Sequence, residues 1–419
     1  METNTPNKAT SSADLRPIPR ISIQAFCETA SVQQMVDTFA ADRRITRAHV
    51  KSHMGGTRAA IEFYENAPTP NVIIVESDLG GNELVAELNL LANVCDADTR
   101  VIVIGKKNDV ELYRRLMKFG VSEYLVAPLE TASLVRAVGD MFTAPDAEPL
   151  GRTIAFVGAK GGCGSSTIAQ NVAWSMSELF HNDVVIADFD FAGGTVGLNF
   201  NQDPTMTIAD ALASSEKLDE TYLDRILAKC TDHLNLLTAP AALDSTYNYS
   251  SREIDSLVEV AQGSVPYFVM DMPYSWSDWT QATLVAADEV IITATPDLAG
   301  LRNAKNLLDS LSQSRKDDPK PHVILNQVDR SKETEIKLAA FEDALGTRVA
   351  LSIPFEPVVF GTAMNNGQMI GESNPKSPIV PQFKSLASRL TGRSEAPTME
   401  RKSIQLPFLE KLRGNKKAS

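Results

Sequence analysis

The sequence predicts two α/β domains in succession, each built on a mostly parallel sheet covered by helices. Short apolar runs alternate with helical patterns along residues 20–142 and again along residues 153–390. This alternation is typical of parallel strands buried on both faces. A polar, proline-bearing stretch at 143–152 separates the two series, and we interpret it as a linker.

In the first series we expect strands at 21–26, 71–75, 100–104 and 123–126, with helices at 84–94 and 110–118 among the segments between them. In the second series the expected strands are at 153–157, 184–187, 234–237, 267–270, 290–293, 322–325 and 349–352. Helical patterns lie between most of them, which indicates a doubly wound sheet of about seven or eight strands.

Composition narrows the class of protein. The 419 residues are 43% hydrophobic and 22% charged, as in globular proteins, and no apolar run is long enough to span a membrane. The net charge of −13 disfavours nucleic-acid binding, which needs clustered lysine and arginine. Residues 1–19 are polar and are expected to form a disordered lead without a signal sequence. The four widely spaced cysteines exclude a C-x-x-C site or an iron–sulfur cluster and favour a cytoplasmic location.

A glycine-rich loop joins an apolar strand to a helix at the start of the second series. Glycines allow successive backbone N–H groups to point at an anion, and a helix N-terminus adds its dipole. The hydroxyl of Ser166 is placed to bind Mg²⁺. The loop therefore predicts binding of ATP with Mg²⁺. The residues expected to contact the nucleotide here are Gly158, Lys160, Gly161, Gly162, Cys163, Gly164, Ser165, Ser166 and Thr167.

The loop departs from the usual G-x-x-x-x-G-K-[ST] pattern, because Ser165 stands at the lysine position and a lysine stands earlier, at Lys160. It resembles the deviant Walker A loop, KGGxGKST, of the MinD/ParA superfamily of dimerising ATPases. The resemblance implies a homodimer in which Lys160 reaches the partner's nucleotide. Loss of the usual lysine is expected to weaken ATP binding and slow hydrolysis, so the enzymatic activity stays open.

Three carboxylates follow strands of this domain. By resemblance, Asp190 would position the attacking water or a switch region. Asp188 would support Mg²⁺ or the loop, and Asp271 would hold Mg²⁺ together with Ser166. The alternative is that they are ordinary carboxylates at strand ends.

Two later segments resemble the part of the superfamily that surrounds the base. Asn326 matches an asparagine that bonds adenine, and Pro354 lies in a segment that flanks the base. A turn-initiating role for Asn326 is the alternative.

The first domain resembles a response-regulator receiver, a flavodoxin-like fold, without its chemistry. Glu76 stands where the phosphoacceptor aspartate is expected, Gly105 replaces the Thr/Ser and Ala127 replaces the lysine. We therefore expect no phosphorylation and a docking or dimerisation role. Glu76 has either a structural role or the role of a permanent charge.

A degenerate receiver followed by such an ATPase with serine in the loop resembles the CpaE/TadZ pilus-assembly family. The resemblance implies work with the pilus-assembly machinery for Flp/Tad-type pili, at the inner membrane or a cell pole. A DNA-partitioning ATPase and a two-component signalling protein are the alternatives.

The last residues, 391–419, are expected to form a flexible basic tail. Residues 399–419 carry six basic and two acidic side chains. Such a tail is compatible with weak membrane contact, a partner-docking peptide or a solvated end.

Overall fold

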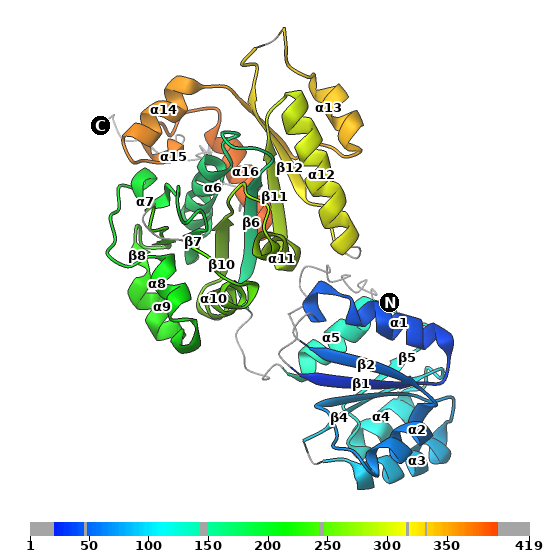
Figure 1. Cartoon of the computed structure of the whole chain (residues 1–419). Helices are drawn as coiled ribbons and strands as arrows, with labels where there is room; N and C mark the ends of the chain where they lie inside the picture. Colours follow the sequence, from blue (N-terminus) through cyan, green and yellow to red (C-terminus); the bar gives the residue numbers. More distant parts are fainter. Residues whose placement is uncertain are drawn as a thin grey trace, which may run out of the picture.

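The computed structural model describes residues 21–45, 48–96, 98–142, 150–242, 247–315, 318–331 and 333–392. These residues form two separate sheets, each with its own helices (Figure 1). The lead predicted at 1–19, most of the linker predicted at 143–152 and nearly all of the predicted tail lie outside the described residues.

The first domain has a five-stranded parallel sheet in the order β2-β1-β3-β4-β5. This order is the flavodoxin-like one. The edge strand β2 was not among the predicted strands, because its side chains are only partly buried and largely polar. The elements are β1 (Ser22–Cys27), α1 (Ala30–Ala40), the 3₁₀ turn η2 (Arg43–Ile45), β2 (His49–Met54), α2 (Gly56–Tyr64), β3 (Val72–Glu76), α3 (Gly81–Val94), β4 (Arg100–Gly105), α4 (Val110–Phe119), β5 (Glu123–Val126) and α5 (Thr131–Met141).

Glu76 ends β3 with its side chain buried. Its carboxylate accepts hydrogen bonds from the N–H groups of Glu28 at 2.7 Å and Thr29 at 2.8 Å, and from the Thr29 hydroxyl at 2.7 Å. These donors belong to the turn between β1 and α1, so Glu76 fastens that turn to the sheet. The contacts favour a structural role over that of an exposed permanent charge.

The second domain has an eight-stranded sheet in the order β13-β12-β11-β6-β10-β7-β9-β8, parallel except for the last pair. The short antiparallel strand β8 was not predicted. The elements are β6 (Arg152–Gly158), α6 (Ser165–Phe180), β7 (Val184–Asp188), α7 (Val196–Asn199), α8 (Ile208–Ala213), the 3₁₀ turn η3 (Ser215–Lys217), α9 (Glu220–Ile226), β8 (Ala228–Lys229), β9 (Leu234–Leu237), α10 (Ser251–Ser264), β10 (Tyr267–Asp271), α11 (Asp278–Ala286), β11 (Glu289–Ala294), α12 (Leu298–Ser314), β12 (His322–Val328), α13 (Leu338–Leu345), β13 (Leu351–Pro354), α14 (Pro357–Asn365), α15 (Ile370–Ser373) and α16 (Val380–Thr391).

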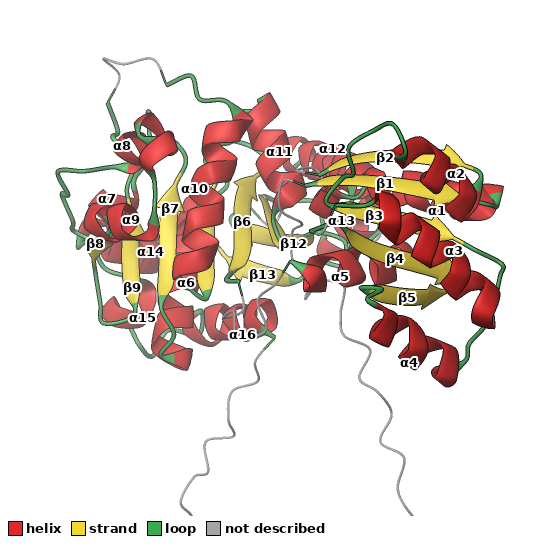
Figure 2. Ribbon diagram, turned by 90° about the horizontal axis from the view of Figure 1, so that it is seen from below, coloured by secondary structure: helices red, strands yellow, loops and turns green. Residues whose placement is uncertain are grey.

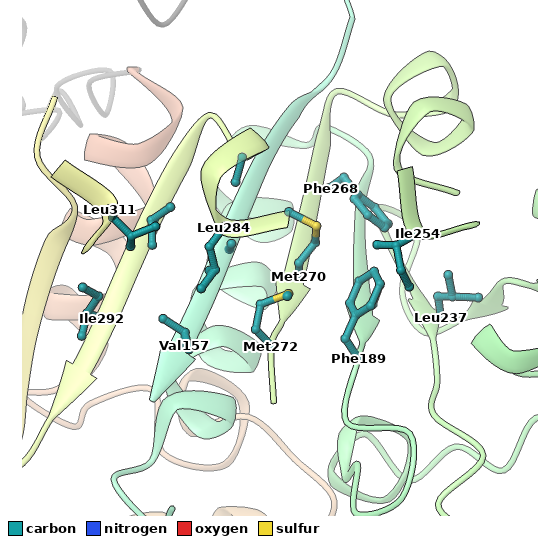
Figure 3. Close-up of a cluster of buried hydrophobic side chains, with 14 of the residues drawn as sticks. Val157, Phe189, Leu237, Ile254, Phe268, Met270, Met272, Leu284, Ile292 and Leu311 are labelled. Carbon is teal, nitrogen blue, oxygen red and sulfur yellow. The ribbon is translucent and has the colours of Figure 1, made fainter. Parts of the chain in front are cut away.

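Both faces of this sheet are buried. Side chains of β6 alternate between two hydrophobic clusters: Val157 packs on the side of α11 and α12, and Phe156 packs on the side of α6 and α16 (Figure 2). Figure 3 shows the first cluster, where Phe268 of β10 lies beside Ile254 of α10 and Met270 of β10 lies toward Leu284 of α11. The near-continuous apolar runs seen in the sequence follow from this burial on both faces.

The predicted boundaries need small corrections. The first strand of the second domain begins at Arg152, inside the predicted linker, and α16 continues to Thr391, inside the predicted tail. Both residues are part of the fold: Arg152 pairs with Glu289, and Thr391 is buried. Among the described helices, none is long and apolar enough to cross a bilayer.

Candidate functional site

The predicted site residues of the second domain gather at the carboxyl edge of its sheet, where β12, β11, β6, β10 and β7 end side by side. In open α/β sheets this edge is where ligands bind. The loop after β6 leads directly into α6, so the N-terminus of a 16-residue helix faces the edge. This is the geometry of an anion site.

Glycine is required at defined points of the loop. Gly162 and Gly164 have φ angles of 75° and 88°, in the left-handed region. A Cβ on Gly164 would lie 2.4 Å from Nδ2 of Asn326, whereas a Cβ on Gly161 or Gly162 would meet no atom within 4 Å. The loop is therefore packed tightly on one side and open on the other, as a phosphate cradle must be.

The two serines at the start of α6 have different surroundings. Ser165 is 8% exposed, and its hydroxyl has no hydrogen-bond partner within the described part of the chain. The Ser166 hydroxyl lies beside the carboxylate of Asp271 and acts to lower its pKa, against the larger effect of burial. The hydroxyl of Thr167 lies 4.0 Å from the sulfur of Met364, on the outer side of the helix. Ser166 thus lies next to a carboxylate of the site. Ser165 places a buried hydroxyl at the position where other P-loops have a lysine.

Asp188 and Asp271 end the neighbouring strands β7 and β10 in direct register, and both are almost fully buried. Burial raises the pKa of Asp188 to about 6, and the nearby Asp190 adds to the shift, while the N–H groups of Val196 and Asp190 oppose it. Burial also raises the pKa of Asp271 well above its usual value, and Asp188 adds to that shift. Two buried, mutually repelling carboxylates beside a hydroxyl are a donor set that a divalent cation would stabilise.

The donor set fits Mg²⁺ only with further oxygen ligands. Within the described ranges no group of three or more His, Cys, Asp or Glu side chains is arranged to hold a metal. Mg²⁺ commonly takes one or two protein carboxylates and completes its shell with water and phosphate oxygens. The residues present therefore fit a magnesium–nucleotide complex rather than a metal held by protein alone.

Asp190 has a separate position on the rim of the site. Its side chain accepts the N–H of Gly193 at 3.0 Å, and the same turn is closed by the bond from Gly194 N–H to the Asp190 carbonyl at 2.7 Å. The structure therefore places Asp190 on a glycine-bearing turn beside the buried pair, with its backbone N–H donating to the carboxylate of Asp188 at 3.1 Å.

Lys160 points across the open side of the loop. Its ammonium lies 2.6 Å from the carboxylate of Asp297, which also caps α12 by accepting the N–H of Gly300 at 2.9 Å. Partial burial opposes ionisation of Asp297, but the bonds from Lys160 and Thr295 outweigh it and lower its pKa to about 2. The pair borders a cavity of about 320 Å³ between the loop and a segment after β12 that includes Gln327, Arg330 and Glu335.

Asn326 is packed against the phosphate loop. Its Nδ2 donates to the carbonyl of Cys163 at 2.8 Å, and Nε2 of Gln327 donates to the carbonyl of Gly162 at 3.0 Å. Pro354 ends β13 next to Val328 of β12. Asn326 therefore braces the loop, and its predicted contact with adenine stays a prediction.

Three residues of this edge were missed by the sequence reasoning: Asp297, Gln327 and Arg330. The guanidinium of Arg330 lies 5.0 Å from the ring centre of Phe355 and bonds to Gln327 at 3.0 Å. An aspartate before a helix is a recognisable N-cap signal for Asp297. Its pairing with Lys160, 137 residues away, has no signal in the local sequence.

Comparison with known proteins agrees with this geometry. Residues 151–323 match the family model described as an AAA domain. A septum site-determining protein MinD of Synechocystis is 26% identical over 263 residues, which are 62% of this chain and 93% of that protein. The crystal structure of a ParA family ATPase from Chlorobium tepidum is similar with a TM-score of 0.53 and 26% identity, covering 56% of this chain and 98% of that one. The crystal structure of a pilus assembly protein CpaE from Caulobacter crescentus matches with 44% identity over 31% of this chain and 98% of that one, with a TM-score of 0.30.

The sheet order, the phosphate loop and the strand-end carboxylates define a P-loop fold of the MinD/ParA-like type. Residues 151–323 are similar to an AAA domain, and the relatives of the chain include MinD and ParA family proteins.

Proposed function

We propose that this protein binds ATP with Mg²⁺ at the carboxyl edge of the second sheet and that the bound nucleotide joins two copies face to face. The paired chains would then mark and scaffold the site of pilus assembly. Hydrolysis would be slow and would serve to end the association rather than to drive work.

The observation that carries the association is the distribution of exposed apolar side chains. Between residues 152 and 392, every large apolar side chain that is exposed in the described segments comes after the carboxyl end of a strand. They are Leu198, Tyr274, Trp276, Leu298, Leu338, Phe355, Val358 and Met364. Leu150, just before β6, is exposed at the opposite edge, whereas these eight follow the carboxyl ends of strands. Apolar groups gathered at one edge in this way are typical of an interaction surface. The surface surrounds the loop, so a second copy would cover the nucleotide.

The charges of the site support slow turnover. The usual lysine would place a positive charge on the transferred phosphoryl group, and Ser165 offers only a hydroxyl there. Lys160 is the loop's own cation, and its side chain is one-third exposed toward the open face. A trans role for Lys160 would couple hydrolysis to association. Ser166, Asp188 and Asp271 would hold Mg²⁺, which supplies charge neutralisation of the phosphates when bound.

The role in pilus assembly rests on the sequence resemblance described above, a degenerate receiver joined to an ATPase whose loop carries serine. In this proposal the first domain is a docking module. Its buried Glu76, held by donors of its own domain, has no exposed carboxylate to accept a phosphoryl group. The protein would act in the cytoplasm at the inner membrane or at a cell pole.

Sedimentation velocity of the full chain with Mg·ATP, Mg·ADP and no nucleotide tests the proposal. We expect a dimer with ATP alone and a monomer for Lys160→Ala under all conditions. Lys229→Ala is the matched control, because its side chain is 69% exposed on β8 and pairs only across a short turn. A Lys160→Ala protein that still dimerises with ATP would rule out the role of Lys160 at the partner's nucleotide. A wild-type chain that stays monomeric with ATP would rule out nucleotide-dependent association.

A further inference from the structure

The first domain contacts the second through the 3₁₀ turn η2. Arg43 and Ile45 of this turn are buried. The Arg43 guanidinium donates from Nη1 to the carbonyl of Ala286 at 2.7 Å and pairs through Nε with Asp318. Ala286 is the last residue of α11, so the first domain holds the C-terminal end of a helix of the second domain.

That helix end is bound by two arginines. Arg315 of the second domain donates to the carbonyls of Leu284 at 3.0 Å, Val285 at 3.2 Å and Ala287 at 2.5 Å, and it shares Asp318 with Arg43. Positive charge at a helix C-terminus is stabilising, because it faces the unpaired carbonyls and the negative end of the dipole. Arg43 therefore adds to a cap that Arg315 already provides, and its removal leaves the carbonyls partly satisfied.

The other end of α11 lies at the candidate nucleotide site. Trp279 in its first turn packs against Phe189 and Phe191 with ring centres 6.2 Å and 5.7 Å apart. These two rings flank Asp190 in the sequence. The residues leading into α11, Tyr274 and Trp276, border a cavity of about 320 Å³ that reaches Gly158 and Ala159 of the phosphate loop. One nine-residue helix thus connects the nucleotide edge with the contact between the domains.

We propose that α11 is a transmission element through which bound nucleotide loosens the docking of the first domain. Phosphate charge at the loop attracts the N-terminal end of the α11 dipole, which Asp278 in the first turn partly offsets. A shift of α11 toward that edge withdraws the Ala286 carbonyl from Arg43 of the first domain. Arg315 belongs to the same domain as α11 and moves with it. The first domain is then freed from the second and becomes available to another protein.

This inference rests on the proposed nucleotide binding. Thermodynamic linkage requires that the Arg43 contact and nucleotide binding affect each other equally. If nucleotide weakens the Arg43 contact, then removing that contact must strengthen nucleotide binding by the same factor. Couplings between sites commonly amount to about five-fold or more. A purely structural Arg43 contact would leave the affinity for nucleotide unchanged.

Calorimetry of full-length variants with Mg·ATP tests the coupling. We expect Arg43→Ala to bind at least about five-fold more tightly than wild type. Arg58→Ala is the matched control and should bind like wild type, because its side chain is 80% exposed and pairs with Glu87 inside the first domain. In a Trp279→Leu background the effect of Arg43→Ala should disappear. Unchanged or weaker binding by Arg43→Ala would overturn the proposal, as would an effect that survives in Trp279→Leu.

Hydrogen exchange in the wild-type chain supplies a second test that needs no variant. Backbone amides of 43–45 should exchange faster with Mg·ATP than without it, and equal or slower exchange would overturn the proposal. Absence of any ATP binding by wild type would instead show that the proposed function itself fails, so the two failures are distinguishable.

Discussion

Replacing Gly164 with alanine adds one methyl group where the phosphate loop touches Asn326. The new Cβ would lie 2.4 Å from Nδ2 of Asn326, at a φ of 88°. A non-glycine residue in the left-handed region costs about 1–2 kcal/mol. Moving Asn326 would also break its bond to the Cys163 carbonyl, a loss of about 1 kcal/mol. The loop would have to leave its present conformation to relieve both costs.

The sum of roughly 2–3 kcal/mol corresponds to about 30- to 150-fold weaker binding of Mg·ATP, at about 1.4 kcal/mol for each tenfold change. Isothermal titration calorimetry measures this loss, and a thermal melt verifies that the variant is folded. Gly361→Ala in α14 is the control, since its added Cβ meets no atom within 4 Å. A folded Gly164→Ala chain that binds Mg·ATP as tightly as wild type would refute this account of the loop.

Three further predictions concern charge. Burial and the charge of Asp188 raise the pKa of Asp271 in the folded protein. The charged form of Asp271 therefore lowers the free energy of unfolding above that pKa, and this destabilisation disappears as the pH falls toward 4. Asp271→Asn should therefore be more stable than wild type at pH 7.5, by about 1–3 kcal/mol, yet bind Mg·ATP poorly. Asp232→Asn, at an exposed position, should change neither the stability nor the affinity for Mg·ATP. An Asp271→Asn chain that is no more stable than wild type in urea would contradict the prediction. Glu76→Gln weakens a carboxylate that accepts three hydrogen bonds, and it should lower the free energy of unfolding of the first domain by about 1–3 kcal/mol. Glu62→Gln, at an exposed position, should leave that free energy unchanged. Equal unfolding curves for Glu76→Gln and wild type would show that the bonds from Glu28 and Thr29 to Glu76 do not stabilise the domain. Plasmid DNA should show no salt-dependent gel shift with the protein, and a clear shift would favour the DNA-partitioning alternative.

Much of the fold could be predicted because its strands are buried on both faces. The strand at 123–126 was predicted with the bounds that the structure has, and the apolar run at 153–157 lies within β6. Strand β2 could not be predicted in this way, since an edge strand with partly exposed polar side chains lacks the apolar signal. The same applies to β8, whose two residues pair only with β9.

The candidate site could be predicted where a motif is local. The loop of 158–167 and the strand-end carboxylates are recognisable because glycine, hydroxyl and acidic residues follow apolar strands at short spacing. Contacts between distant segments have no such signal. The pairing of Lys160 with Asp297 and the contact of Arg43 with Ala286 join residues 137 and 243 positions apart, and packing alone creates them.

ATP at this loop is proposed to control the association of two chains. Light scattering of the full chain during titration with Mg·ATP, with phosphate release followed in the same sample, measures this control. We expect the mass to double on addition of Mg·ATP, well before appreciable phosphate is released, and to stay unchanged with Mg·ADP. A mass that does not depend on nucleotide, or rapid phosphate release by a chain that remains monomeric, would contradict it.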